Sequence, residues 1–297
     1  MVRADRDTEA ILRGEIFKHL EEMVRETGAV TRQQLWDFTV DGRTHRLVDR
    51  NRGIRNPRDM LATLSILSDP KSKYADEEIG DSLFAYAYRE GSVEGDNKKL
   101  RAALEFDLPL ILLRKIADGV FVPVVPVYVI ADDKPNRRFM IALDDTLRSV
   151  SDPLNLLPLE RQYAQRITKQ RLHQPEFRGR VLRAYECQCA VCNLKHAKLL
   201  DAAHIIADGQ PHGTPTVDNG LSLCKIHHAA YDEQFLGITP DYEVRINSDL
   251  LEERDGPMLL HGLQEMHGRS LFTPSRSKDK PSKDRLAERF REFQEAS

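Results

Sequence analysis

Residues 223–232 read LCKIHHAAYD, and this stretch places two histidines side by side, the first of them three residues after a cysteine. Neighbouring residues on a helix point about 100° apart, so His227 and His228 can rarely share one small ligand. Each histidine is therefore expected to serve a site of its own, and the residues around the stretch indicate which sites these are.

The four cysteines of the chain all lie between positions 187 and 224. In a cytosolic chain such clustering favours a metal site over disulfides. A C-x-x-C half-site is followed, about 30 residues on, by a C-x-x-H half-site, a pattern typical of one tetrahedral zinc. Cys187 could compete as a ligand, and buried thiols without a metal are the alternative. We predict a structural Zn²⁺ held by Cys189, Cys192, Cys224 and His227.

The second histidine has a different neighbour. On a helix His228 and Asp232 are four residues apart and share a face, where an imidazole and a carboxylate form part of a site for a harder divalent ion. Upstream, the apolar segment LLDAAHIIAD carries His204, and VDNGLSLC carries Asn219. The order along the chain is therefore the C-x-x-C half-site, a histidine on a strand, an asparagine on a loop, the C-x-x-H half-site and a second histidine on a helix.

The ordered motifs CAVC, DAAHI and DNGLSLCKIHHAAYD resemble the HNH nuclease family and its ββα-metal fold, over about residues 177–232. The resemblance implies that His204 is the general base and that Asn219 orients the base or its loop. It also implies that His228 binds a catalytic Mg²⁺ or Mn²⁺ ion. Many members of the family have an acidic metal ligand directly before the first histidine, where this chain has Ala203.

Another residue must therefore complete the catalytic metal site. Asp232 is the first candidate, and Asp201 is a weaker one because it faces away from His204 on a strand. The residue types suit phosphodiester hydrolysis. A neutral histidine can take a proton from water near neutral pH, and a divalent ion offsets the developing charge. Zinc with four protein ligands has no open position, so its expected role is structural.

The segment before residue 150 has a different character. Gly, Pro, Asp and Asn separate its apolar runs, which favours a mostly β barrel or curved sheet. Pro123 and Pro126 favour an edge or bulged strand, and DDKPNRR favours a hairpin turn. We predict an α+β protein overall. The strand candidates are LWDFTV, HRLV, LATLSILS, SLFAYAY, LPLILLRK and VFVPVVPVYVI, with one helix at NKKLRAAL.

Within this part, SILSDPKSKYADEEIGDSLFAYAYREG resembles the SRA (YDG) domain of the PUA-like superfamily, and the match covers about residues 53–129. The resemblance implies that a modified cytosine is flipped out of the duplex and stacked between Tyr74 and Tyr86. Asp76 or Glu77 would accept a hydrogen bond from the cytosine amino group. Ordinary packing in a sheet is the alternative for these tyrosines.

The chain is expected to be cytoplasmic and without a membrane partner, because its charged start lacks a signal-peptide core and no apolar run could cross a bilayer. Thr8 is the expected cap of a first helix that Gly28 ends. We divide the chain into an N-terminal helix (1–28), an SRA/PUA-like reader domain (29–150), a helical linker (151–175), an HNH domain (176–260) and a polar linker with a C-terminal helix (261–297).

These features together predict a modification-dependent endonuclease that acts on double-stranded DNA containing 5-methylcytosine or 5-hydroxymethylcytosine. Cutting both strands with one HNH site per chain favours a homodimer, and the apolar stripes of the first and last helices are candidate contacts. One alternative is a non-catalytic, zinc-stabilised DNA reader. The other is a nuclease that acts on RNA or on unmodified DNA.

Overall fold

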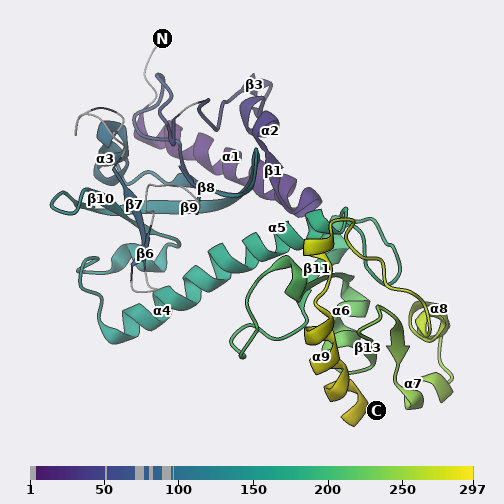
Figure 1. Ribbon diagram of the computed structural model, residues 1–297. Helices are drawn as coiled ribbons and strands as arrows, with labels where there is room; N and C mark the ends of the chain where they lie inside the picture. Colours follow the sequence, from purple (N-terminus) through teal and green to yellow (C-terminus); the bar gives the residue numbers. More distant parts are fainter. Residues whose placement is uncertain are drawn as a thin grey trace. The chain divides into compact units, whose positions relative to one another are not determined.

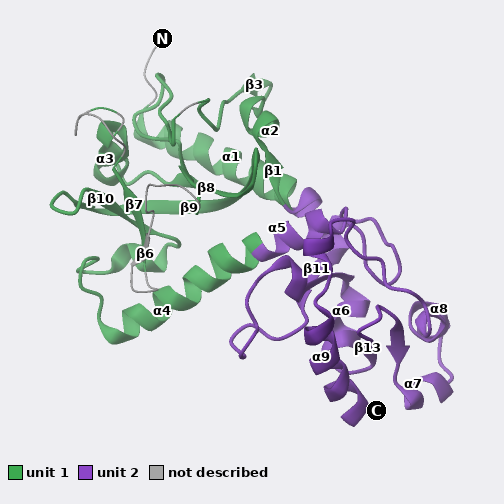
Figure 2. Cartoon of the chain, viewed as in Figure 1, with its two compact units in different colours: residues 1–24, 29–176 green, residues 25–28, 177–297 purple. Residues whose placement is uncertain are grey.

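A computed structural model gives the fold of the chain (Figure 1). It divides the chain into two compact units (Figure 2), residues 1–24 with 29–176 and residues 25–28 with 177–297. No helix in the described part of the chain is long and apolar enough to cross a membrane. The structure describes residues 5–50, 52–70, 77–79, 83–88, 95 and 97–296, with the backbone alone at 77–79.

The first unit is a mixed α/β structure around one curled sheet. Its helices are α1 (Arg6–Thr27), α2 (Arg32–Trp36), α3 (Asn97–Glu105) and α4 (Pro158–Thr168), the last followed by a π-helical turn (Lys169–His173). Its strands are β1 (Val30–Thr31), β2 (Thr39–Val40), β3 (Arg43–Thr44), β4 (Ile54–Arg55), β5 (Ser65–Ser68), β6 (Glu77–Ile79), β7 (Leu83–Ala87), β8 (Leu110–Ala117), β9 (Val120–Asp133) and β10 (Arg138–Ala142).

Eight of the described strands form the sheet, in the order β4-β5-β8-β9-β10-β7-β6, with β1 pairing with β9 beside this path. Strands β5 and β8 run parallel, and the other neighbours in the sheet are antiparallel. Strands are present within the expected runs LATLSILS, SLFAYAY, LPLILLRK and VFVPVVPVYVI, the first of which is a strand only at Ser65–Ser68, and the hairpin expected at DDKPNRR joins β9 to β10. A closed SRA-type barrel stays a prediction.

Two of the expected strands are wrong in whole or in part. Within LWDFTV, Leu35 and Trp36 end helix α2, because Thr31 and Gln34 form a capping box that begins a helix there. Only the last two residues of that run form a strand, β2. The run HRLV forms no strand, and its apolar residues are buried in the core without pairing in a ladder.

The two prolines lie in β9, which is an interior strand between β8 and β10. At the prolines themselves β9 pairs, among the described strands, with β8 alone, because its ladder with β1 ends at Phe121 and its ladder with β10 begins at Tyr128, so the strand has a local edge there. The bulge alternative holds for Pro126, because the β8–β9 register shifts between Leu110 and Leu112, which pair with Val127 and Val124 on either side of it, whereas Pro123 pairs in register with Leu113. A proline has no amide hydrogen to donate, so it is tolerated where the ladder is irregular.

The N-terminal helix begins one turn earlier than its expected cap. The side chain of Asp5 accepts hydrogen bonds from the backbone amide and the hydroxyl of Thr8, so Asp5 and not Thr8 caps α1. Gly28 has φ +74° and follows the last residue of the helix, as expected. The buried face of α1, with Ile16 and Leu20, packs inside the first unit.

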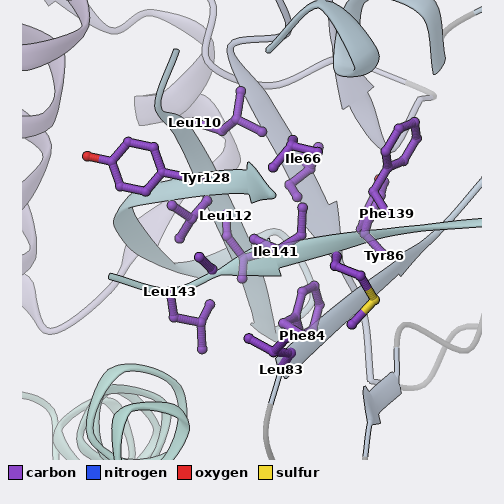
Figure 3. Packing of buried hydrophobic residues seen from close by; sticks show 14 of the residues in the cluster. Ile66, Leu83, Phe84, Tyr86, Leu110, Leu112, Tyr128, Phe139, Ile141 and Leu143 are labelled. Carbon is purple, nitrogen blue, oxygen red and sulfur yellow. The ribbon is translucent and has the colours of Figure 1, made fainter. Parts of the chain in front are cut away.

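The main core lies against the sheet, where side chains from β5, β7, β8, β9 and β10 pack together (Figure 3). Ala164, Ile167 and Leu172 also belong to this cluster. The segment 151–175 therefore contributes to the first unit and does not stand apart as a linker. The unit boundary falls between Glu176 and Phe177, inside helix α5.

The second unit is built on a ββα element. It contains α5 (Gln174–Ala184) from Phe177 onward, the antiparallel pair β11 (Leu200–His204) and β12 (Gly220–Cys224), and α6 (Lys225–Asp232) directly after β12. The remaining elements are β13 (Leu236–Ile238), β14 (Val244–Ile246), α7 (Ser248–Glu252), α8 (Pro257–Gly262) and α9 (Lys283–Glu295).

The C-terminal segment is a packed part of the second unit, whereas the sequence suggested a polar linker with a separate helix. Leu271 and Leu286 are buried in the core of this unit. A Cβ at Gly237 would lie 2.6 Å from the ring of Phe293, so α9 sits directly on β13. The apolar stripes of α1 and α9 thus pack largely inside their own units, and their role as dimer contacts stays a prediction.

Candidate metal centre and active site

Four donor atoms meet at one place in the second unit. The ligand atoms of Cys189, Cys192, Cys224 and His227 all lie within 4.8 Å of one another. His227 Nδ1 is 3.1 Å from Cys224 Sγ and 3.5 Å from Cys189 Sγ, and the sulfurs of Cys192 and Cys224 are 4.0 Å apart. Tetrahedral zinc would set about 3.5 Å between sulfur and nitrogen and about 3.8 Å between sulfurs. The four residues therefore fit a metal ion such as zinc.

The start of helix α6 brings the second half-site together. Cys224 is the N-cap of α6 and His227 lies in the first turn, so both side chains turn toward the same end of the helix. The backbone amide of Cys224 donates to Cys189 Sγ over 3.3 Å. Contacts with Cys189, Cys192 and His227 hold the pKa of the Cys224 thiol well below its ordinary value, which favours the thiolate that a metal needs.

The ring of His227 is oriented from its far side. Its Nε2 lies 2.8 Å from the carbonyl oxygen of Gly262 and donates to it, which leaves the lone pair of Nδ1 facing the sulfurs. Burial lowers the pKa of His227, but the adjacent sulfurs of Cys189 and Cys224 raise it by more, so the net pKa is about 10. Without a metal a proton therefore lies on Nδ1 between the sulfurs, and a metal ion bound there would take its place on the neutral ring.

The remaining cysteine is not part of the cluster. Cys187 Sγ lies 3.8 Å from the carbonyl oxygen of Thr27. The amide of Cys187 donates to Leu182 O, in a turn after the end of α5 at Ala184 in which both Glu186 and Cys187 have positive φ. Cys187 is therefore not one of the residues of the metal cluster, although the sequence alone allowed it as a ligand.

His204 ends strand β11 and pairs across the ladder with Gly220. Its ring stacks on that of Phe177, with centroids 4.0 Å apart and planes 16° from parallel. A Cβ at position 220 would lie 2.5 Å from a methyl carbon of Val181 and 2.9 Å from the Phe177 ring. Glycine at this position therefore allows α5 to lie close enough to the strands to hold the imidazole of His204.

Asn219 is fully buried, and its side-chain amide bonds to backbone groups. Its Oδ1 accepts from Ile206 N over 2.9 Å, and its Nδ2 donates to Ile206 O over 3.0 Å and to Thr214 O over 3.1 Å. These bonds tie together the loop that follows His204. The arrangement suits a residue that positions the loop and does not itself react.

His228 lies on α6 with a carboxylate near each of its ring nitrogens. Its Nε2 is 3.4 Å from Asp232 Oδ2, and its Nδ1 is 3.7 Å from Asp201 Oδ2. Asp201 also pairs with Lys225. Residues 201 and 204 lie on opposite faces of strand β11. On its own face Asp201 approaches His228, a contact that the sequence alone did not indicate.

One pocket of about 310 Å³ joins these residues. It is lined by His204, His228 and Asp232, and also by Arg289 and Glu292 of the C-terminal helix α9. The last two were missed in the sequence analysis, which considered only the apolar stripe of that helix. The charged residues on its other face were the available signal, but nothing local placed that face at this pocket.

Arg289 holds the end of helix α6. Its Nη2 donates to the backbone oxygen of Tyr231 over 3.0 Å and to that of Asp232 over 3.4 Å, while Nη1 pairs with Glu292 over 2.6 Å. The guanidinium also lies 5.2 Å from the centre of the Tyr231 ring. Orphan carbonyls at a helix C-terminus attract cations, so Arg289 fixes the backbone that carries Asp232.

The structure describes only some of the residues that were expected to bind a flipped base. Tyr74 and Asp76 lie outside the described residues, and Glu77 is described only as backbone in β6, where it pairs with Ala85. Tyr86 is fully buried in the sheet core (Figure 3), and its hydroxyl donates to Gly53 O over 2.9 Å. This is the sheet-packing alternative, and stacking on a base would require the ring to leave the core.

Residues 189–239 match the family model described as HNH endonuclease. This segment is an HNH endonuclease domain. The match contains the four metal-cluster residues, His204, Asn219, His228 and Asp232. The HNH domain continues into a larger unit, since Gly262, Arg289 and Glu292 lie beyond the matched residues.

Two solved structures are similar to the chain. One is the modification-dependent TagI restriction endonuclease, with 17% identity over 88% of this chain and 90% of that one, and a TM-score of 0.28. The other is the type IV phosphorothioation-dependent restriction endonuclease ScoMcrA, with 16% identity over 90% of this chain and 55% of that one, and a TM-score of 0.26. No curated protein sequence matches the chain.

Proposed function

We propose that the protein is a DNA endonuclease whose HNH domain hydrolyses phosphodiester bonds. The observation that carries the proposal is the shared pocket, lined by an imidazole on a strand and by an imidazole with a carboxylate on the following helix. The zinc-type cluster uses all four of its donors and stands apart from this chemistry.

In this proposal His204 takes the proton from the attacking water, in the neutral form that imidazole has near pH 7. The stacked ring of Phe177 keeps the imidazole in one plane, and Asn219 keeps the loop after it in place. Mg²⁺ or Mn²⁺ held by His228 and Asp232 would offset the charge that develops on the phosphate. Two protein donors suit such ions, which usually keep waters and also bind substrate phosphate.

Asp201 is a positioning residue in the same proposal. Its Oδ2 lies 3.7 Å from Nδ1 of His228, on the side of the ring away from Nε2, which faces Asp232 and the pocket. Asp201→Asn should raise the Mn²⁺ concentration for half-maximal cleavage by about 10- to 100-fold while the rate at saturating Mn²⁺ changes little. Lys225→Ala is the matched control, because it removes the ion pair of Asp201 and leaves the contact with His228. An unchanged metal requirement in Asp201→Asn and Asp201→Ala would contradict this role.

We further propose that the substrate is double-stranded DNA with a modified cytosine, on the basis of the SRA-like sequence of residues 53–129. One plasmid grown with and without cytosine methylation or hydroxymethylation should be cut only in its modified forms. His204→Ala protein prepared in the same way controls for contaminating nuclease. Equal cutting of all forms would favour the nuclease for unmodified DNA, and binding without any cutting would favour the non-catalytic reader.

A homodimer remains the simplest way for one HNH site per chain to cut both strands, and it is part of the proposal. Its contacts must lie outside the buried residues of the α1 and α9 stripes. Sedimentation of the protein with and without modified DNA would test it, and a monomer that cuts both strands at single-turnover concentrations would contradict it.

A further inference from the structure

An arginine-rich surface of the first unit has no role in the function described so far. Residues 32–59 contain seven arginines, four aspartates and no lysine or glutamate, although the net charge of the whole chain is −3. Arg43, Arg46, Arg50 and Arg58 are all exposed. The excess of positive charge is therefore local and faces solvent.

Two of these arginines lie over the ring of Trp36. The guanidinium carbon of Arg46 is 4.4 Å from the ring centre, and that of Arg50 is 4.8 Å from it. We name Trp36, Arg46 and Arg50 the Trp36 patch. A guanidinium that lies on an aromatic face keeps its N–H donors directed outward from the ring, where they can meet an oxyanion.

The backbone beneath the Trp36 patch is fixed. Arg32 Nη1 donates to Asp49 O over 2.9 Å, and Arg55 Nε donates to Arg46 O over 2.9 Å. Between the two patch arginines, Leu47 and Val48 are buried in the core. The backbone that carries the guanidinium groups is thus held in place, so little backbone conformational entropy is lost when a ligand binds.

The two patch arginines, Arg46 and Arg50, stand outside the ion pairs of the described residues. Both cations lie on one indole, within about one Debye length (~10 Å) at 0.1 M salt, so they repel each other. A polyanion would relieve this repulsion and release its own counterions on binding.

We propose that the Trp36 patch binds the phosphate backbone of duplex DNA and holds it on the first unit, independently of base modification. The inference rests on the proposed function, because that function makes DNA the substrate. Trp36 is the one apolar side chain of the patch, because the neighbouring Leu47 and Val48 are buried, and a lipid surface is normally bound through a wider apolar face.

Trp36 is the sole tryptophan of the chain, so its fluorescence reports on this surface directly. A 30-base-pair unmodified duplex, added to the full-length protein without Mg²⁺ or Mn²⁺, should change that fluorescence. Arg46→Ala with Arg50→Ala should weaken binding at least tenfold at about 50 mM salt and reduce the slope of log K against log salt by about 1.8. The control is Arg6→Ala with Lys18→Ala, which removes the same charge from α1.

Unchanged affinity and slope in the Arg46/Arg50 variant would overturn the inference. So would an equal loss in the control, which would point to net charge alone, or binding of the wild type to phosphatidylserine vesicles but not to DNA. The two proposals fail separately. If the protein cuts DNA normally but the patch variant binds as the wild type does, the endonuclease proposal stands and the patch proposal fails. If the protein binds DNA through the patch but never cuts it, the patch proposal stands and the endonuclease proposal fails.

Discussion

The Cys224→Ala protein should lose its metal and the fold of its HNH domain. The substitution removes one ligand of the cluster together with the contact between its sulfur and Nδ1 of His227. Binding of structural zinc supplies about 10–16 kcal/mol in zinc-finger peptides, which equals or exceeds the whole stability of an ordinary domain, about 5–15 kcal/mol. Loss of one ligand is therefore expected to unfold this part of the chain.

Zinc content per chain and the thermal unfolding profile are the measurements that check this expectation. Wild-type protein should contain one equivalent of zinc, and Cys224→Ala should contain none and lose the unfolding transition of the second unit. Cys187→Ala is the matched control, since its sulfur lies outside the cluster, and it should keep both. A folded, active Cys224→Ala protein without zinc would show that the cluster is not structural.

His204→Ala should abolish cleavage and leave DNA binding intact. A positioned general base contributes about 10²- to 10⁴-fold to a rate, so the single-turnover rate should fall by that factor. Affinity for DNA comes mainly from phosphate contacts, which this change does not touch. The experiment compares the cleavage rate at saturating Mn²⁺ with the dissociation constant for the same duplex at fixed salt and without divalent ions.

His196→Ala is the control for this experiment, because His196 is an exposed histidine of the same domain outside the pocket. It should change neither the rate nor the affinity. Near-normal cutting by His204→Ala would remove His204 from the role of base. A parallel loss of binding and folding would instead show that its stacking on Phe177 is structural.

Local spacing was enough to find the metal cluster and the helix that follows it in the second unit. A C-x-x-C pair and a C-x-x-H pair place their ligands through the geometry of one turn each, so the cluster could be predicted before any long-range contact was known. The same holds for His228 and Asp232, whose distance is set by one turn of helix α6. The strands of the first unit were also found where an apolar run agreed with its local propensity.

Local spacing failed where packing between distant segments decides the outcome. Asp201 meets His228 only because β11 lies beside α6, and Arg289 reaches the pocket only because α9 packs on β13. Tyr86 has the pattern of a binding residue and of a core residue alike, and burial against the sheet places it in the core. Sequence alone thus determined the ligands that neighbours along the chain bring together, whereas tertiary packing decided which distant charges complete the pocket, because a side chain's partners across a fold depend on how whole elements stack.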